Sequence, residues 1–588
     1  MSLLKKLALM LQDARKRRPY YCEVECLIGT GEQYIDLGLY GTTQSTIDIV
    51  FGMSSTDGGA VNNGAIFGGR TAQTSNTFTM FKLASATPQY FRFDYNGQKQ
   101  VATANQITWN TTSKYRLQYD GTKAIITNIT TRESRTENVS PPSSTTTSTI
   151  CLFCVNTSGT KGTYYKGPIY RCQYSDGTNS VDVIPVLDWN MNPCMYDKIN
   201  GVFYYNQGSG TFQYGREIHY VDYLEATGTQ YIDTGYPIIT STDTLSITYE
   251  NTSTINHKWL MGSYEPGAQI GISSATVTAP TIWYKNKVDL TQAEEYYNPH
   301  TLLYDSNGVS NDGVNKASFQ SFTGTWNIYL FALNNTGTSP NGYFGYGKIY
   351  SYTHKRNNVL IRDYLPAIDE NGVGFMFDRV THTCFLNAGT GVFKYPAREL
   401  TYLQTTGTQY IDTGYKAVPA TTKFEFMFQC DNISDSTFIF GARPDTSATS
   451  QYTCATYKPT SRIRQDWAGL SDFFTGITTT DKYLYTAYNN TITLNDTTVT
   501  GTISRSTTRS DYNFLLFTVN TGGTADSRMF VGKGYRAKLW DNGTLVRNYS
   551  PVFLNGSAGM LDKVNNVFYG NAGTGTFGVG KIVEKEYE

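Results

Sequence analysis

One sequence motif returns three times along this chain of 588 residues, and the distance between its copies sets the size of the folding unit. The motif is a glycine-containing turn followed by Gln-Tyr-Ile-Asp, and it lies at residues 29–36, 226–233 and 405–412. In the first copy a glutamate precedes the glutamine, where the other copies have threonine. The spacing of its tyrosines, Tyr34, Tyr231 and Tyr410, allots about 180–200 residues to each copy. Solenoid repeats are far shorter, at about 20–50 residues. The repeat therefore predicts three whole domains in tandem.

Further anchors follow the motif in the same order within each copy. The first is a Tyr-Asp-Gly-type turn, which favours a tight hairpin, and the second is an apolar run ending in Asn, which we interpret as a buried strand. The last is an Asp followed by a basic residue and then by an Asn-x-Gly-x-Gly-x-Phe segment. The turns lie at 119–121, 304–308 and 488–490, the apolar runs at 152–156, 330–334 and 516–520, and the closing segments at 197–212, 378–393 and 562–577.

Composition and spacing predict an all-β fold. The chain has 54 Gly, 46 Tyr and 30 Phe, so strand formers alternate with residues that favour turns. Turn signals recur at short intervals and helical periodicity is almost absent after residue 19, which fits an antiparallel two-sheet sandwich. We therefore expect three sandwich domains, at 19–216, 217–396 and 397–588, joined by short segments near 215–218 and 396–399.

The opening segment, residues 1–18, differs in kind from the rest. Its apolar residues recur at helical spacing and predict a short amphipathic helix that ends before Pro19. The stripe consists of Leu3, Leu7, Met10, Leu11 and Ala14. We interpret it as an anchor that docks in another protein; packing on the first sandwich, an oligomer seam and a membrane-surface helix are the alternatives. Its apolar run is short and a basic cluster follows it, so export through a signal peptide is not expected.

Charge and cysteine content exclude several classes of function. Lys plus Arg number 48 and Asp plus Glu number 48, which argues against an electrostatic nucleic-acid binder. No apolar stretch reaches the roughly 18 residues of a membrane-spanning helix. The nine cysteines form no disulfide framework, and Cys151 and Cys154 stand in an apolar run without a second pair, which favours buried thiols over zinc. The sequence therefore predicts no metal and no cofactor.

Repeated aspartates are the strongest candidates for chemistry, and a structural role is favoured for both sets. Asp36, Asp233 and Asp412 stand at strand ends, where a carboxylate bonds turn amides; calcium is the alternative, but no run of alternating aspartates supports it. Asp197, Asp378 and Asp562 precede a hairpin in each copy. No copy contains a Glu-x-Asp-x-Glu pattern, which would place two carboxyl groups on one strand face as a retaining glycosidase requires. All five histidines lie at 219–382, so none is common to the three copies, and we expect no enzyme.

Three tryptophans occupy the variable middle parts of the copies. An indole can stack on the face of a sugar ring, although core packing is the more ordinary use of a large aromatic side chain. We therefore treat Trp109, Trp283 and Trp467 as candidate ligand-binding residues, with core packing as the alternative.

Taken together, these segments resemble concanavalin A-like (laminin-G-like) jelly-roll domains. The resemblance rests on Thr-Gly-Thr-Gln-Tyr-Ile-Asp-Thr-Gly-Tyr at 227–236 and 406–415, on the Asn-ending runs and on the closing Asn-Ala-Gly-Thr-Gly-x-Phe, and it covers nearly everything after Pro19. With Leu-Ile-Arg-Asp-Tyr-Leu-Pro at 360–366 and Leu-Val-Arg at 545–547, the chain is similar to repeats in structural proteins of gut tailed phages, including the crAss-like group, and of some gut bacteria. The first copy departs from the pattern at 36–39 and lacks the Arg near 182–185.

The resemblance implies a non-enzymatic virion surface protein. We expect a head or tail fibre-like appendage, assembled in the host cytoplasm, whose helix binds other capsid or tail proteins and whose sandwiches bind host glycans; homo-oligomerisation is left open. On this hypothesis the first domain is the adaptor and the second and third face the ligand. The alternatives are a glycan-degrading enzyme on a jelly-roll scaffold and a bacterial surface adhesin.

Overall fold

The computed structural model confirms the all-β prediction for the residues that it describes. These are 18–53, 64–73, 75–83, 90–95, 99–101, 110–139, 141–255, 257–276, 279–289, 296–418, 420–433, 436–444, 451–457, 461–468, 470–501 and 510–584. They form strands and turns and no helix, so no helix among them could cross a membrane. The predicted anchor helix lies outside the described residues, which begin at Arg18.

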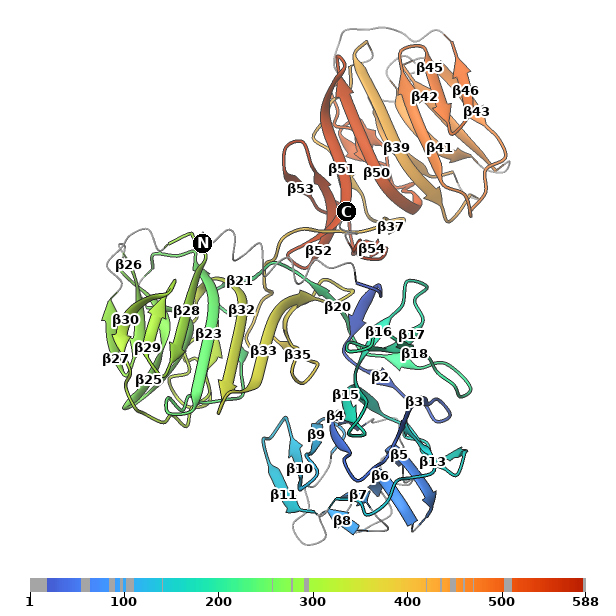
Figure 1. The fold of residues 1–588 in the computed structure, drawn as a ribbon. Helices are drawn as coiled ribbons and strands as arrows, with labels where there is room; N and C mark the ends of the chain where they lie inside the picture. The colour runs from blue at the N-terminus through green and yellow to red at the C-terminus, as the bar shows by residue number, and fades with distance from the viewer. Residues whose placement is uncertain are drawn as a thin grey trace. The chain divides into compact units, whose positions relative to one another are not determined.

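The first copy, residues 19–216, builds two sheets (Figure 1, blue to green). The larger has the order β11 (Ser134–Asn138), β10 (Lys123–Asn128), β9 (Lys114–Tyr119), β4 (Thr46–Gly52), β15 (Pro168–Ser175), β16 (Ser180–Leu187), β17 (Pro193–Asp197), β18 (Phe203–Tyr204), with β1 (Cys22–Val24) on β16, and β2 (Leu27–Ile28) between β15 and β19 (Gln213–Tyr214). The smaller has the order β14 (Thr160–Gly162), β13 (Val155–Thr157), β5 (Gly64–Ala72), β6 (Ser75–Leu83), β7 (Tyr90–Tyr95), β8 (Lys99–Val101), with β12 (Thr149–Leu152) pairing β3 (Ile35–Tyr40) and β5.

The second copy, residues 217–396, repeats this arrangement. Its larger sheet has the order β30 (Val314–Ser318), β29 (Gly308–Asn311), β28 (His300–Asp305), β23 (Asp243–Asn251), β32 (Tyr346–Arg356), β33 (Val359–Ile368), β34 (Gly374–Asp378), β35 (Thr383–Leu386), with β20 (Glu217–Tyr220) on β33 and β21 (Leu224–Thr227) on β32. Its smaller sheet has the order β22 (Ile232–Asp233), β31 (Tyr329–Leu330), β24 (Lys258–Glu265), β25 (Ala268–Thr276), β26 (Ala279–Tyr284), β27 (Asn286–Asp289).

The third copy, residues 397–588, has the same strand order again. Its larger sheet runs β46 (Thr497–Thr500), β45 (Thr491–Leu494), β44 (Tyr483–Tyr488), β39 (Thr422–Cys430), β50 (Val531–Asp541), β51 (Thr544–Leu554), β52 (Ser557–Asp562), β53 (Val567–Tyr569), with β36 (Arg398–Glu399) on β51, and β37 (Leu403–Thr406) between β50 and β54 (Gly578–Val579). Its smaller sheet runs β38 (Ile411–Asp412), β47 (Leu515–Leu516), β40 (Phe438–Arg443), β41 (Tyr452–Tyr457), β42 (Arg462–Trp467), β43 (Leu470–Phe474), with β48 (Asn520–Thr521) between β40 and β49 (Thr524–Ala525).

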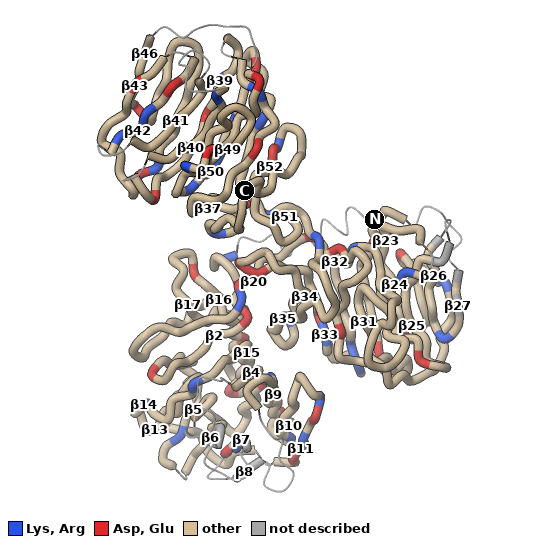
Figure 2. Tube along the Cα trace, turned by 180° about the vertical axis from the view of Figure 1, so that it is seen from behind, with Lys and Arg blue, Asp and Glu red and all other residues tan. Residues whose placement is uncertain are grey.

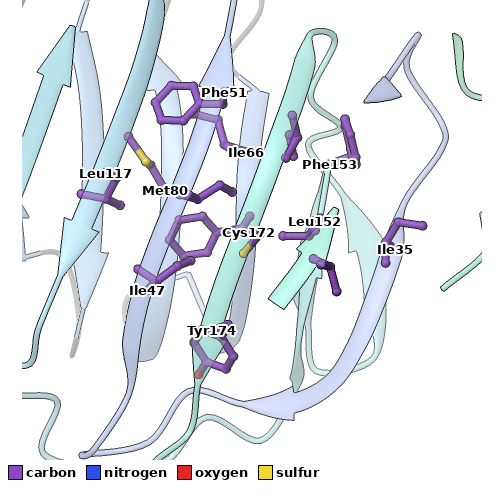
Figure 3. Close-up of a cluster of buried hydrophobic side chains, with 14 of the residues drawn as sticks. Ile35, Ile47, Phe51, Ile66, Met80, Leu117, Leu152, Phe153, Cys172 and Tyr174 are labelled. Atoms are coloured by element: carbon purple, nitrogen blue, oxygen red, sulfur yellow. The ribbon is translucent and has the colours of Figure 1, made fainter. Parts of the chain in front are cut away.

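Alternation along the strands places one core between the two sheets of each copy. In β9, Tyr115, Leu117 and Tyr119 are buried while the intervening side chains are partly exposed. Successive side chains of a strand point to opposite faces, so one face of the larger sheet is apolar and the other is polar. Figure 3 shows Leu117 of the larger sheet and Met80 of the smaller sheet in one buried cluster. The same alternation in β39 buries three phenylalanines of the third copy, and two of them, Phe424 and Phe426, contact Phe440 of the smaller sheet.

Contacts divide the chain into two compact units rather than the three domains that the repeat predicts. The first unit comprises 1–370, 374–391 and 584–588 and so holds the first two copies, and the second comprises 371–373 and 392–583. The first two copies share a unit because β20 pairs with β1 as well as with β33, which joins their larger sheets by hydrogen bonds. The expected joint near 215–218 is therefore part of a ladder and not a free linker.

The Asn-ending apolar runs are buried, as predicted, but they are not continuous strands. The phenylalanine at the second position of each run, Phe153, Phe331 or Phe517, has a positive φ of 62–71°. A bulky residue rarely adopts this conformation, so it persists only where surrounding contacts hold it. In the third copy, the Phe517 amide donates to the Ile439 carbonyl and the Phe517 carbonyl accepts from the Phe530 amide. The kink ends one short strand and starts the next.

Candidate functional site

The repeated motif aspartates bind turn amides, as the structural interpretation predicts. One carboxylate oxygen accepts a hydrogen bond from the glycine two residues later, which closes the turn. These bonds run from Gly38 N to Asp36 Oδ1 (3.0 Å), from Gly235 N to Asp233 Oδ1 (2.8 Å) and from Gly414 N to Asp412 Oδ1 (2.9 Å). The other oxygen accepts from Thr149 Oγ1 (2.8 Å), Asn327 Nδ2 (3.1 Å) and Asn513 Nδ2 (3.2 Å), respectively. Both oxygens of each carboxylate are thus engaged within the fold.

The motif and the closing segment of each copy, far apart in sequence, bind each other. The side chain of a closing asparagine accepts from the backbone amide of the motif tyrosine. These bonds join Tyr34 N to Asn206 Oδ1 (3.1 Å), Tyr231 N to Asn387 Oδ1 (3.0 Å) and Tyr410 N to Asn571 Oδ1 (3.1 Å). The motif glutamine caps its own turn in the same way, as Thr406 N donates to Gln409 Oε1 at 2.9 Å. The repeated residues therefore close each sandwich, and we assign them a structural role.

The second set of aspartates is fully buried and organises the hairpin that follows. Asp562 Oδ1 accepts from the amides of Asn548 (2.9 Å) and Val564 (3.1 Å), and Oδ2 accepts from Asn565 Nδ2 (2.7 Å). Arg547 Nε lies 3.5 Å from the same carboxylate. Asp378 and Asp197 accept equivalent amide bonds in the other copies. These carboxylates are structural, as expected.

The three candidate tryptophans have different surroundings. Trp109 lies outside the described residues. Trp467 is 0 % exposed and packs edge-on against Tyr452 at 5.2 Å, so it leaves no face for a ligand, and the prediction of a binding platform there is wrong because β42 turns this side chain into the core. Trp283 is partly exposed and contacts Trp259 (5.5 Å) and Tyr264 (5.5 Å). Of the two candidate tryptophans that the structure describes, only Trp283 has exposed surface on which a sugar ring can stack.

The paired cysteines of the first copy are buried thiols, as interpreted. Cys151 and Cys154 are both 0 % exposed. The hydrogen bond with Cys154, together with burial, raises the pKa of the Cys151 thiol. Among the described residues, no further histidine, cysteine or carboxylate side chain completes a metal-binding group with this pair.

A polar hollow lies on the outward face of the larger sheet in the first copy. It has a volume of about 550 Å³ and is lined by β4, β9, β10, β15 and β16. Strand register places one row of side chains across these five strands: Ile125, Gln118, Asp48, Gln173 and Asp182. Asp182 at the end of the row is buried against Arg171 and does not line the hollow. Thr46, Ser175 and Ser180 form a parallel row beside the first. We call this hollow the β4 groove.

Hydrogen bonds fix the charged part of the β4 groove and leave amide and hydroxyl groups for a ligand. Asp48 accepts from Arg116 through Nε (2.7 Å) and Nη2 (2.5 Å) and from Gln118 Nε2 (3.1 Å). Among the described residues, no hydrogen bond of the Gln173 side chain is found, and this side chain is partly exposed. Ile199 at the rim is 58 % exposed and offers an apolar contact. The groove therefore suits an uncharged, hydroxyl-rich ligand better than a strongly charged one.

Two acidic side chains line the groove, and neither has the environment of a general acid. Asp120 accepts from the backbone amides of Thr122 (2.8 Å) and Lys123 (2.7 Å), and these bonds lower the pKa of its carboxyl group. Asp48 is held in the ion pair with Arg116 at 21–22 % exposure. A glycosidase acid needs a raised pKa, which comes from apolar surroundings or a nearby like charge.

Sequence reasoning missed the groove because its residues come from strands that are distant in the chain. Their only sequence signal is the polar half of each alternating strand, such as Arg116 and Gln118 between Tyr115, Leu117 and Tyr119. The equivalent row positions hold Ser246 and Thr353 in the second copy and Glu425 and Lys538 in the third, so the groove chemistry belongs to the first copy. Figure 2 shows acidic and basic residues interspersed along all three copies, in keeping with the balanced charge.

Comparisons with known proteins give matches to solved structures only. No protein-family model and no curated protein matches the chain. The LG1-3 region of the laminin alpha2 chain is 10 % identical over 95 % of this chain and 100 % of that chain, with a TM-score of 0.24. Domains LG4-5 of the mouse laminin alpha1 chain are 10 % identical over 57 % and 94 %, with a TM-score of 0.23. A mutant of NanB sialidase from Streptococcus pneumoniae is 9 % identical over 94 % and 90 %, with a TM-score of 0.16. TM-scores this low do not establish a shared overall fold, so the all-β assignment rests on the strand pairing itself.

Proposed function

We propose that this chain is a non-enzymatic binding protein of three tandem jelly-roll domains, and that it binds an oligosaccharide in the β4 groove. The observation that carries the proposal is the row of amide, carboxylate and hydroxyl groups that strand register places across five strands beside an exposed Ile199. Sugars present hydroxyl groups at their edges and C–H groups on their faces, and this row offers partners for both. Because Asp48 and Asp120 are both held by internal bonds, the groove favours binding over hydrolysis.

Gln173→Ala is expected to weaken oligosaccharide binding about 10-fold, which corresponds to the loss of one or two hydrogen bonds worth about 1 kcal/mol each. The side chain is partly exposed on β15, so the substitution leaves the core intact. Isothermal titration of the full chain, with the oligosaccharide that binds best on a glycan array, measures the effect. Thr353→Ala is the matched control, because Thr353 occupies the equivalent position of the second copy. Equal affinities of the two variants, or no oligosaccharide bound at all, would overturn the assignment.

The phage resemblance adds a location to this proposal. We place the chain on a virion surface, as a head or tail fibre-like appendage assembled in the host cytoplasm, a reducing compartment that accommodates the nine free cysteines. Residues 2–18 then dock in another capsid or tail protein through the stripe of Leu3, Leu7, Met10, Leu11 and Ala14. The β4 groove lies in the first copy, so the proposal gives that copy a ligand as well as the adaptor role.

Deletion of residues 1–18 is expected to abolish incorporation of the chain into phage particles while leaving its oligosaccharide binding unchanged. The reason is that the stripe, and not the sandwiches, supplies the docking surface in this proposal. Particles assembled with the full and the shortened chain are compared by quantitative immunoblot. Undiminished incorporation of the shortened chain would rule out the anchor, and the assignment of the oligosaccharide site to the β4 groove would be unaffected.

A further inference from the structure

A cysteine, a histidine and a glutamate converge where the first copy meets the leading strand of the second. β1 and β20 pair antiparallel with Glu23 opposite Ile218 and Val24 opposite Glu217. Continuing this register by one residue places Cys22 opposite His219, and strand alternation puts Glu217 on the same face as His219. The sequence hides this cluster because Cys22 lies far from the other two residues in the chain.

The three side chains present their ligand atoms to one small space. Sγ of Cys22, a carboxylate oxygen of Glu217 and a ring nitrogen of His219 all lie within 4.8 Å of one another. Cys22 and His219 are both 0 % exposed, and the Glu217 side chain is 13 % exposed. His219 Nε2 lies 2.9 Å from Glu217 Oε2, so both atoms already point to the same place. The cluster is therefore enclosed and small enough for one ion.

We propose that Cys22, Glu217 and His219 bind one zinc ion that fastens β1 to β20. Thiolate, imidazole and carboxylate are the ligand types that zinc takes in proteins, and three protein ligands leave one tetrahedral position for water. Binding releases two protons, that of the Cys22 thiol and that of the hydrogen bond between His219 Nε2 and Glu217, and the thiolate and one carboxylate balance the charge of the cation.

The second nitrogen of His219 has the partner that a metal-bound imidazole needs. Nδ1 lies 2.6 Å from Glu584 Oε1, in the same compact unit, and this carboxylate fixes the ring so that Nε2 faces Cys22 and Glu217. Such a carboxylate is the usual outer partner of a histidine that binds zinc. The third copy offers an internal comparison. In its leading strand, β36, Arg398 stands at the position that Cys22 holds in β1 and that His219 holds in β20. The site therefore belongs to the joint between the first two copies and is not a general feature of the repeat.

Cobalt binding by the full chain tests the site, since Co²⁺ replaces zinc and gives a thiolate-to-metal charge-transfer band when cysteine binds it. The metal-depleted full chain is expected to take up one Co²⁺ with this band, and Zn²⁺ is expected to displace it. Cys22→Ser should abolish the band, whereas Cys194→Ser, which replaces another fully buried thiol of the same copy, should leave it unchanged. A band of equal strength in Cys22→Ser, or no band in the wild-type chain, would overturn the proposal.

Glu584→Gln keeps the test decisive if Cys22→Ser fails to fold. Because Glu584 orients the ring and does not bind the ion, this variant is expected to keep the cobalt band and to lower zinc affinity about 10–100-fold. The affinity is measured by competition with a chromophoric chelator, and Glu32→Gln, an exposed position outside the cluster, serves as the control. Unchanged zinc affinity in Glu584→Gln would contradict the assigned geometry.

Discussion

Replacing Gly573 by alanine is expected to destabilise the third copy by about 3 kcal/mol, because no room exists for a methyl group where the closing segment crosses the motif. A Cβ at Gly573 would overlap the Thr408 carbonyl oxygen, well inside the van der Waals contact distance, and it would also press on the Tyr410 ring at 3.1 Å. Backbone atoms cannot yield as a flexible side chain can, so the closing segment must move and lose the hydrogen bond that Tyr410 N donates to Asn571 Oδ1. Differential scanning calorimetry of the full chain measures the loss as a melting temperature lower by roughly 6–12 °C for the transition of this unit.

Gly570→Ala provides the matched control for this prediction. Gly570 lies three residues earlier, and its Cβ would meet only the Phe568 ring at 3.4 Å, an ordinary contact distance. The expected change in the free energy of unfolding is within about 0.5 kcal/mol. Equal effects of the two substitutions would show that the crossing at Gly573 does not hold the sandwich closed. Gly208 and Gly389 stand at the same crossing in the other copies, so the expectation extends to them.

Asp562→Ala is expected to destabilise the same copy by about 3–5 kcal/mol, the cost of removing one partner of a buried charged network. The substitution leaves the amides of Asn548 and Val564 without an acceptor and the guanidinium of Arg547 without its carboxylate. Asp562 is 0 % exposed, so water cannot easily replace these bonds. Chemical denaturation of the full chain, followed by far-ultraviolet circular dichroism, measures the free energy of unfolding.

Two further variants separate the carboxylate's role from a general effect of removing an acid. Asp496→Ala removes an exposed aspartate of the same copy and should change stability by less than about 0.5 kcal/mol. Asp197→Ala in the first copy should cost less than Asp562→Ala, because Val181 stands there in place of the arginine. A larger cost at Asp197 would mean that the arginine contributes nothing to the network.

The repeat made the fold class and the turn-binding role of its aspartates predictable. Asp36, Asp233 and Asp412 were expected to bond turn amides, and they do so because an aspartate followed two residues later by glycine has few other uses at a strand end. The hairpin at 119–121 was predicted for the same reason, since Asp120 binds the amides of Thr122 and Lys123. Local chemistry of this kind is visible in a single stretch of sequence.

Features that depend on strand pairing were not predictable. Backbone hydrogen bonds to Ile439 and Phe530 hold Phe517 in its left-handed conformation, and nothing in its own segment signals it. The β4 groove needs the register of five strands, and the cluster of Cys22, Glu217 and His219 needs the pairing of β1 with β20. Trp467 shows the same limit, because strand alternation alone did not reveal which face of β42 is buried.

A crystal structure of the full chain, soaked with the oligosaccharide that binds best on a glycan array, tests the central claim most directly. The account predicts a sugar in the β4 groove, with hydroxyl groups bonded to Gln118 and Gln173 and a ring face against Ile199. The glycosidic bonds of the bound oligosaccharide should be intact. A sugar bound elsewhere, such as on Trp283 of the second copy, or a cleaved product in the groove would contradict the account.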